Sequence, residues 1–373
     1  MKIGLVRRGY SPSGGAESYL KRFAGALQRV VHEVVLFASP EWPEEQRPCQ
    51  HFFPVSAKTP LTFARTLSSL NPRQQCDCLF SLERVFECDI YRAGDGVHAA
   101  WLRRRAELEP FWKPIWRVCH PKHRQLLKLE ESMLLHRGAV FVIANSNMVK
   151  DEIVKFYTYP EERIAVIYNG LESCEIDFDP ELRDRKRLEL NLKSEDTAIL
   201  FAGSGWERKG LAYAIGGVEK VLAETSKRTL APGKLTLLVA GRGKQKAYLT
   251  GKHVRFLGAV SDMKSYLAAA DIFLLPTLYD PFSNACLEAL GSGLPTITTS
   301  ANGFSEIIRH GEEGEVLEKP WDTQGIARAI LQWLDPERRR EMRPKLVELA
   351  GQHRIEQNLE QTLACIQKLH QRR

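Results

Sequence analysis

The sequence predicts an α/β fold in two halves, each built on a parallel sheet covered by helices. Three observations support this fold class. The chain has 373 residues, which suits two domains of about 150–200 residues. Short apolar runs alternate with helical stretches, as in parallel sheets with helices on both faces. The alternation stops between Leu171 and Ser194 and then begins again.

Each expected strand is a short run of mostly aliphatic residues, and each expected helix has apolar residues at helical spacing. The strands expected in the first half are 2–7, 31–38, 77–82, 88–92, 139–144 and 163–168. Those expected in the second half are 197–203, 234–240, 253–257, 271–276, 294–299 and 314–318. The expected helices are 15–29, 122–137, 146–157, 209–225, 261–269 and 284–291.

The interruption is typical of a linker followed by a surface helix. It holds an acidic run from Glu172 to Asp179, then Pro180 and the mixed-charge segment 183–187. We therefore expect one domain over 1–170 and a second over 171–355. Ligands of such folds bind at the carboxyl ends of the strands, so two facing sheets would enclose a central cleft.

Composition limits the classes of protein that fit. The chain is 43% hydrophobic and 27% charged, which argues against global disorder. Its apolar runs are strand-sized, well short of the roughly 18–20 residues that span a bilayer, and no signal peptide is recognisable at the start. We therefore expect a cytoplasmic protein. Asp177-Phe178-Asp179 matches a metal motif in letters only, so no metal site is expected.

Charge is concentrated in the first half of the chain. The net charge is +7, and residues 1–170 hold 24 Lys and Arg against 18 Asp and Glu. Residues 92–137 hold 10 basic and 5 acidic residues together with four histidines. A basic segment indicates an anionic partner, namely phosphate, nucleic acid or a membrane surface, unless it is simply a solvated face.

A glycine pair lies between the first strand and the first helix. Gly14 and Gly15 would let the backbone approach a ligand, and the N–H groups that begin the helix favour an anion. A tight turn between strand and helix explains the same residues. The motif alone leaves both interpretations open.

Two further motifs follow strands of the second half. Arg208 and Lys209, beside a glycine turn, suit a pyrophosphate, although solvated cations would look the same. After the strand at 271–276, Ser283 or Asn284 is a good N-cap, so that the N–H groups of Asn284, Ala285 and Cys286 would face an anion. Asp280 and Glu288 flank this helix start and suit sugar and ribose hydroxyls.

The segment Gly241-Arg242-Gly243 also follows a strand and resembles a dinucleotide fingerprint. The acid expected about 20 residues later has no convincing position. Nicotinamide binding is therefore not favoured, and these glycines are expected at most to line a donor site.

Together these motifs resemble the family 4 retaining glycosyltransferases of the GT-B fold, which has two Rossmann-like domains. The segments that carry the resemblance are Gly14-Gly15, Ile167 to Gly170, Arg208-Lys209, Asp280-x7-Glu288 and Asn302 to Ile308. The first acid of the family's acid-x7-Glu motif is usually Glu, whereas here it is Asp280. The resemblance implies an N-terminal acceptor domain, a C-terminal nucleotide-sugar domain, and a helix within 356–373 that packs back on the first domain.

Within this family, Asp89 to His98 looks most like the lipopolysaccharide core glucosyltransferases. The resemblance implies transfer of glucose from UDP-glucose to an inner-core heptose, without a metal or a resident cofactor. It also marks Asp95 and His98, with Asp280, as candidate catalytic residues. A polar loop after the strand at 88–92 is the plainer explanation of the first two.

The basic segment then has a candidate partner, the anionic inner surface of the cytoplasmic membrane, where a glycolipid acceptor would lie. Cations mixed with aromatic residues suit such an interface. The candidate membrane and acceptor patch consists of Arg103, Arg104, Arg105, Trp112, Trp116, Lys122 and Arg124. A domain core with a solvated rim would also explain the aromatic residues.

Two other functions remain open from the sequence. A nucleotide-sugar epimerase of the same fold would share the phosphate site but would need no basic lipid-facing surface. A nucleic-acid-binding protein could use the basic segment, yet no known recognition motif is present, so nucleic acid is not expected as a partner. A glycosyltransferase with another donor or acceptor would carry the same motifs.

Overall fold

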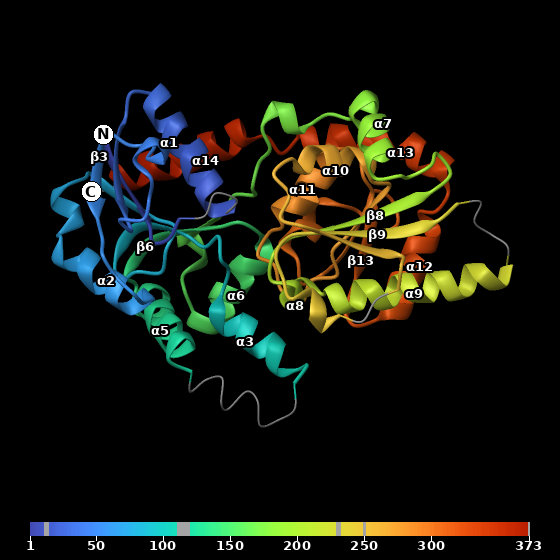
Figure 1. The fold of residues 1–373 in the computed structure, drawn as a ribbon. Coiled ribbons are helices and arrows are strands. Elements are labelled where there is room, and N and C mark those ends of the chain that lie inside the picture. The colour runs from blue at the N-terminus through green and yellow to red at the C-terminus, as the bar shows by residue number, and fades with distance from the viewer. Residues whose placement is uncertain (11–14, 110–119, 229–232, 249–250, 372–373) are drawn as a thin grey trace. The chain divides into compact units, whose positions relative to one another are not determined.

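The computed structural model describes residues 1–10, 15–109, 120–228, 233–248 and 251–371. The chain divides into two compact units. Unit 1 comprises Met1–Tyr168 with Ile355–Arg373, and unit 2 comprises Asn169–Arg354. Each unit is built on one parallel sheet with helices on both faces (Figure 1). The α/β prediction of two parallel-sheet domains is therefore confirmed.

Unit 1 has a seven-stranded sheet in the order β3-β2-β1-β4-β5-β6-β7. Its strands are β1 (Lys2–Arg7), β2 (Glu33–Ala38), β3 (His51–Pro54), β4 (Cys78–Ser81), β5 (Cys88–Arg92), β6 (Ala139–Ala144) and β7 (Ile164–Val166). Its helices include α1 (Gly15–Arg29), α2 (Pro60–Ser69), α3 (His98–Ala106), α5 (Pro121–Glu130), α6 (Asn147–Tyr157) and α14 (Ile355–His370). A π-helical turn at Glu131–Leu135 follows α5, so the helix expected at 122–137 is α-helical at first and π-helical near its end.

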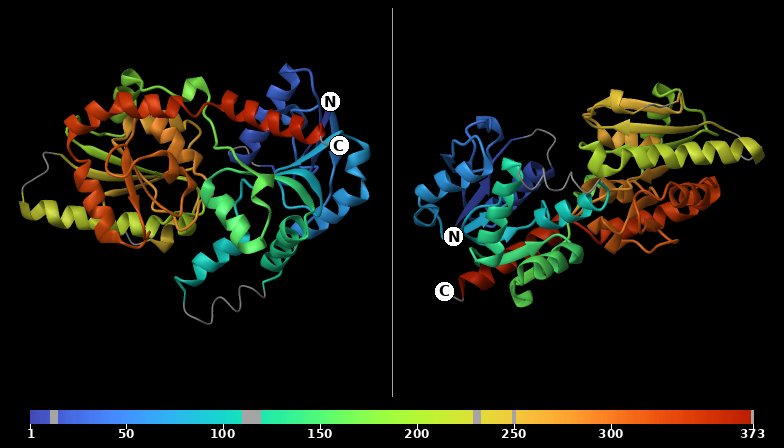
Figure 2. Two further views of the ribbon diagram at one scale, coloured as in Figure 1. Left: turned by 180° about the vertical axis from the view of Figure 1, so that it is seen from behind. Right: turned by 90° about the horizontal axis from the view of Figure 1, so that it is seen from below.

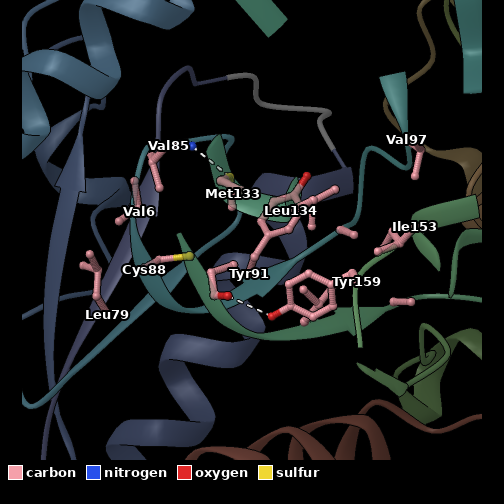
Figure 3. Packing of buried hydrophobic residues seen from close by; sticks show 14 of the residues in the cluster. Val6, Leu79, Val85, Cys88, Tyr91, Val97, Met133, Leu134, Ile153 and Tyr159 are labelled. Atoms are coloured by element: carbon pink, nitrogen blue, oxygen red, sulfur yellow. Dashed lines mark hydrogen bonds between the residues drawn. The ribbon is translucent and has the colours of Figure 1, made fainter. Parts of the chain in front are cut away.

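Successive side chains of β1 point to opposite faces of this sheet, and each face has its own core. Leu5 packs with Phe23 of α1 and Leu359 of α14 on one face. Val6 packs on the other face in a cluster that includes Met133 and Ile153. Figure 3 shows this second cluster, in which the Val85 N–H donates to Met133 Sδ at 3.1 Å. The C-terminal helix α14 is thus part of the core of unit 1.

Unit 2 has a six-stranded sheet in the order β10-β9-β8-β11-β12-β13. Its strands are β8 (Thr197–Ala202), β9 (Leu235–Ala240), β10 (Val254–Gly258), β11 (Ile272–Leu274), β12 (Thr296–Thr299) and β13 (Gly314–Leu317). Its helices include α7 (Pro180–Glu189), α8 (Trp206–Lys209), α9 (Leu211–Arg228), α10 (Met263–Ala269), α11 (Asn284–Gly291), α12 (Thr323–Gln332) and α13 (Pro336–Gly351). Figure 2 shows α9 and α12 together on one face of this sheet.

The surface helix expected after Pro180 is α7, which is mostly exposed and is also bonded to the sheet. Asp179 caps it by accepting from the Leu182 N–H at 2.9 Å, so this acid of the Asp-x-Asp motif serves the helix. The guanidinium groups of Arg183 and Arg187 bind Asp271, at the start of β11, at 2.6 and 3.1 Å. The helix is therefore anchored to the sheet through two arginines of its mixed-charge segment, a contact that the sequence alone did not predict.

Candidate functional site

The predicted donor residues lie at the point in the unit 2 sheet where the strand order reverses. The chain runs outward from β8 to β10, then returns to place β11 beside β8. Arg208 and Lys209 follow β8, and Asp280 follows β11. Parallel α/β sheets bind their ligands beyond the carboxyl ends of the strands at this reversal. The topology thus brings two motifs that are far apart in the sequence to one position.

The loops after β8 and β11 are bonded to each other through one main-chain bond and one bond from a side chain to the main chain. Arg208 Nη1 donates to the carbonyl of Tyr279 at 2.7 Å, and the Leu278 N–H donates to the carbonyl of Arg208 at 2.9 Å. Gly210 has φ +79°, and a Cβ at this position would lie 1.9 Å from the carbonyl oxygen of Pro276. Only glycine permits so close an approach, which holds Arg208 and Lys209 against the second loop.

Lys209 and Asp280 form an ion pair at the centre of this site. Lys209 Nζ donates to Asp280 Oδ2, and the two side chains are only 11% and 8% exposed. The carboxylate balances the ammonium charge in surroundings where an unpaired charge would be costly. An arriving diphosphate would find this ammonium preorganised, and the carboxylate beside it suits a sugar hydroxyl. The pairing of these two predicted residues was not foreseen from their spacing.

The helix α11 begins at this site with a cap on Ser283, whose Oγ accepts from the Cys286 N–H at 3.4 Å. The prediction that Cys286 would present a free N–H is therefore wrong. The N–H groups of Asn284 and Ala285 open the helix, where no intrahelical carbonyl is available to them. The Asn284 side chain accepts from Asn169 Nδ2 at 2.5 Å. Burial raises the pKa of the Cys286 thiol to about 12, so this thiol is not a nucleophile at neutral pH.

Asn302, which is fully buried, holds the start of α11 in place. Its Oδ1 accepts from the N–H groups of Ser283 and Phe304, both at 3.1 Å. Its Nδ2 donates to Thr298 Oγ1 at 2.9 Å. The residue lies in a segment that carries the family resemblance but was not predicted as a site residue. A side chain that bonds to three separated positions leaves no periodic signal in the sequence.

Replacing Asn302 with leucine is expected to destabilise unit 2, because two buried N–H groups lose their acceptor. Each unsatisfied group costs about 1–3 kcal/mol. Thr298→Val removes the bond from Asn302 Nδ2 and the bond from the Thr298 hydroxyl to the Leu275 carbonyl, but it leaves both N–H groups with their acceptor and is expected to cost less. Urea denaturation of both variants compares the free energies of unfolding, and an Asn302→Leu variant as stable as the wild type would contradict this role.

Glu288 lies one turn into α11, with a half-buried side chain. It is thus on the helix that begins at the site, as expected of a residue for ribose hydroxyls.

The glycines of the discounted fingerprint have a packing role. A Cβ on Gly241 would lie 2.2 Å from the carbonyl oxygen of Gly203, and one on Gly243 would lie 2.2 Å from the Trp206 ring. These glycines therefore support the loop after β8.

The other candidate residues lie in unit 1, after β5. The side chain of Asp95 is 55% exposed and lies 4.0 Å from the guanidinium of Arg84. His98 begins α3, and its Nε2 lies 2.9 Å from His123 Nδ1. Burial lowers the pKa of His98 to about 3, and the charges of Arg84 and His123 act in the same direction. The imidazole of His98 is therefore neutral at physiological pH.

Sequence reasoning missed a charged cluster at the strand-order reversal of unit 1. Arg7, at the end of β1, binds Glu17 of α1 at 3.0 Å and Glu83, just after β4, at 2.9 Å. Burial raises the pKa of Glu83, although Arg7 opposes that shift. Glu17 belongs to the glycine motif, which was the only available signal. Of that motif, Gly15 begins α1, whereas Gly14 lies outside the described residues.

The predicted membrane and acceptor patch is only partly free in unit 1. Arg103, Lys122 and Arg124 are exposed. Arg104 instead pairs with Glu152 at 2.9 Å, and Arg105 pairs with Glu109 at 3.1 Å. Trp112 and Trp116 lie outside the described residues. In the part of the chain that the structure describes, we find no helix with the length and apolar character needed to cross a bilayer.

Two family models match the chain. The model "Glycosyltransferase Family 4" matches residues 13–173, and the model "Glycosyl transferases group 1" matches residues 196–336. The chain belongs to the family 4 glycosyltransferases. This assignment confirms the family that the motifs of both units resembled.

Known members of this group of glycosyltransferases show different extents of similarity. An uncharacterized glycosyltransferase of Methanocaldococcus jannaschii is 30% identical over 207 residues, which are 52% of this chain and 51% of the relative. The match thus spans about half the length of that relative. Lipopolysaccharide glucosyltransferase WaaG of Escherichia coli is 21% identical over 332 residues, which are 85% of each chain.

Solved glycosyltransferase structures share the fold. The crystal structure of WaaG superposes with a TM-score of 0.80 at 18% identity and covers 96% of this chain and 98% of its own. The structure of Anabaena HepE in complex with UDP and glucose has a TM-score of 0.75 at 17% identity and covers 98% and 99%. These likenesses confirm the GT-B class, with two Rossmann-like sheets.

Proposed function

We propose that this family 4 glycosyltransferase is a retaining enzyme that transfers a hexose, glucose from UDP-glucose, to an inner-core heptose of lipopolysaccharide or to a related glycolipid. The observation that carries the proposal is the position of Arg208, Lys209 and Asp280 at the strand-order reversal of unit 2. The names of two relatives support the donor and the acceptor. WaaG is a lipopolysaccharide glucosyltransferase, and HepE was crystallised with UDP and glucose.

In this proposal the charge that develops on the departing diphosphate is stabilised by unit 2. Arg208 and Lys209 supply positive charge, and the N–H groups of Asn284 and Ala285 supply the positive end of α11. Glu288 binds the ribose hydroxyls and Asp280 the donor sugar. Because these groups are held by main-chain bonds and an ion pair before the donor arrives, little reorganisation is needed during the reaction.

The transfer exchanges one bond of the anomeric carbon for another. The bond to the phosphate oxygen breaks as the acceptor oxygen bonds to the same face, and the acceptor proton passes to the departing diphosphate. Asp95 orients the acceptor hydroxyl, and the neutral His98 accepts a hydrogen bond from the acceptor. We propose that the cations of unit 2 act in place of a metal. Transfer that persists in EDTA would support this part, and transfer that requires an added divalent cation would contradict it.

We also propose that unit 1 meets its glycolipid acceptor on the anionic inner face of the cytoplasmic membrane, without crossing it. Three exposed cations, Arg103, Lys122 and Arg124, support this proposal. Each Lys or Arg near such a surface contributes about 1 kcal/mol. The paired Arg104 and Arg105 are expected to contribute less, since Glu152 and Glu109 already neutralise them.

Replacing Arg103, Lys122 and Arg124 with glutamine is expected to weaken binding to anionic liposomes by about 10²-fold, the equivalent of three such contributions. A matched control replaces the exposed Lys193, Lys220 and Lys345 of unit 2 in the same way. Sedimentation with vesicles of increasing anionic lipid content measures the difference. Equal weakening by the two triple variants, or binding that is insensitive to salt, would contradict the proposed patch.

The experiment that tests the function is incubation with a panel of UDP-sugars, with and without a heptose-containing core acceptor, followed by mass spectrometry. The proposal predicts an acceptor that gains one hexose from UDP-glucose. A UDP-sugar converted to its epimer without any acceptor would instead indicate an epimerase, the second candidate. Transfer from a different UDP-sugar would support a glycosyltransferase activity but would contradict UDP-glucose as the donor.

A further inference from the structure

A buried carboxylate in unit 1 contacts the loop that carries Asp95 and His98. Glu130, at the end of α5, is only 1% exposed. Its Oε1 accepts from the His98 N–H at 2.5 Å, and its Oε2 accepts from the Ala99 N–H at 3.1 Å. These N–H groups open α3, so the carboxylate stands at the positive end of that helix. Tyr157 of α6 donates its hydroxyl to Oε2 at 2.8 Å and orients the carboxylate from the other side.

A buried guanidinium completes this arrangement from the loop after β4. Arg84 Nε donates to Glu130 Oε1 at 2.8 Å, and its Nη2 donates to the carbonyl of Gly96 at 2.7 Å. Its Nη1 lies 4.0 Å from Asp95 Oδ2. Burial alone would lower the pKa of Arg84, but the surrounding negative charges, Glu130 and Asp95 among them, raise it overall. Arg84 therefore stays charged between the two carboxylates.

The two side chains thus hold the loop by its main chain on both sides of Val97. Arg84 binds the carbonyl before Val97, and Glu130 binds the two N–H groups after it. A planar guanidinium fork fixes direction as well as distance, which a lysine ammonium does not. Asp95 and His98, the side chains assigned to the acceptor in the proposed function, lie on this loop, and the His98 ring also contacts His123 of α5 at 2.9 Å.

We propose that Arg84 and Glu130 are positioning residues that fix Asp95 and His98 for the acceptor step. The inference rests on the proposed function, because it assigns these two loop residues to the acceptor. Small displacements of reacting groups of about 1 Å can cost on the order of 10² in rate. Loss of either anchor is therefore expected to lower kcat by about that factor, while the KM for the UDP-sugar, which binds to unit 2, stays within about twofold.

The test uses the full chain with Arg84→Met, Glu130→Gln, the conservative Arg84→Lys, and the double variant Arg84→Met with Glu130→Leu. Removing one member leaves a buried charge unpaired and lowers stability, whereas removing both relieves the charge part of that penalty and leaves only the lost bonds to the His98 and Ala99 N–H groups. A positioning role predicts that the double variant regains part of the thermal stability but not kcat. Arg84→Lys is expected to recover part of the rate. A double variant that recovers both stability and kcat would overturn the proposal and leave a purely structural ion pair.

A control uses another buried acid of unit 1 that forms an ion pair with a partly exposed arginine. Asp89, at the start of β5, binds Arg73 at 3.2 Å. Arg73→Gln breaks this ion pair, which does not involve the loop of Asp95 and His98, and is expected to leave kcat unchanged. A loss of kcat in Arg73→Gln as large as that in Glu130→Gln would show that breaking any ion pair of a buried acid has this effect, and would count against a positioning role.

A second readout separates this inference from the proposed function, because it needs no substrate. Nuclear magnetic resonance of labelled histidines follows the His98 imidazole as the pH is lowered. Its neighbours with charge are Arg84, Glu130, Lys122 and His123. In the wild type the ring should stay neutral well below pH 5, whereas a loosened loop in Glu130→Gln should let it titrate near 6.5. An unchanged His98 titration in Glu130→Gln would overturn the inference, even if the enzyme transfers a sugar. A changed titration would support the inference, even if the enzyme accepts no UDP-sugar as donor.

Discussion

Replacing Lys209 with alanine is expected to lower the rate of glycosyl transfer by about 10²–10³-fold, the usual cost of removing one preorganised electrostatic group. The ammonium of Lys209 is almost buried and held in place by Asp280 before any donor binds. The loss should therefore appear in kcat as well as in KM, because the charge on the diphosphate grows as the bond to the sugar breaks. Initial rates with UDP-sugar and acceptor measure it.

Two variants serve as comparisons for Lys209→Ala. Lys220→Ala removes an exposed lysine of α9 in the same unit and is expected to leave the rate unchanged. Asp280→Asn keeps the size of the side chain but frees the ammonium from its carboxylate. If Asp280 binds the donor sugar, its loss also lowers kcat, although the diphosphate should bind at least as tightly. Equal rates for Lys209→Ala and the wild type would contradict the proposed role of Lys209.

Replacing Asp271 with asparagine is expected to destabilise unit 2 by about 3–5 kcal/mol, the usual cost of leaving buried charges without their partner. Asp271 is buried and accepts from Arg183, Arg187 and the Ala198 N–H, at 2.6, 3.1 and 2.8 Å. Arg339 lies 3.8 Å away. One carboxylate thus neutralises several guanidinium groups. Glu189→Gln, at the exposed pair with Lys186, is the control and should change stability by well under about 1 kcal/mol.

The same carboxylate predicts a direction for the pH dependence of stability. Burial alone would raise the pKa of Asp271, but Arg183, Arg339 and other partners lower it below its ordinary value. A carboxylate with a lowered pKa in the folded state stabilises the fold above its unfolded pKa of about 3.9. That contribution is lost as the pH falls through the folded value. Urea denaturation between pH 6 and about 3 should therefore show a smaller pH dependence for Asp271→Asn than for the wild type.

The alternation of strands and helices was predictable because each element satisfies a local rule. The helix at 284–291 matches α11, since Ser283 caps it and the buried strand β11 precedes it. The strand β3, His51–Pro54, was missed because it offers only Phe52 and Phe53 before Pro54, and its side chains are half-buried or exposed. The helix α7 lies on the surface as expected, but its anchor was missed, because nothing near 183–187 in the sequence indicates that Asp271 is its partner.

The residues proposed to bind the donor could be picked out from the sequence because glycine turns, paired cations and a helix cap are local signals. Their relations could not, since they depend on strand order. Lys209 and Asp280 come together only because β11 returns to the side of β8. Arg84 and Glu130 had no local signal at all, because each is a single charged residue whose partner comes from another element. Local signals in the sequence thus point more readily to the groups proposed to contact ligands than to those proposed to position them.

The most direct test of the central claim, that the carboxyl ends of β8 and β11 bind the nucleotide sugar, is hydrogen–deuterium exchange of the full chain with and without UDP. We predict that UDP slows exchange in 203–210 and 280–288, with smaller changes in the same segments for Lys209→Ala. Protection that appears instead at 239–247, the discounted fingerprint, or that is the same in Lys209→Ala and the wild type, would contradict this claim.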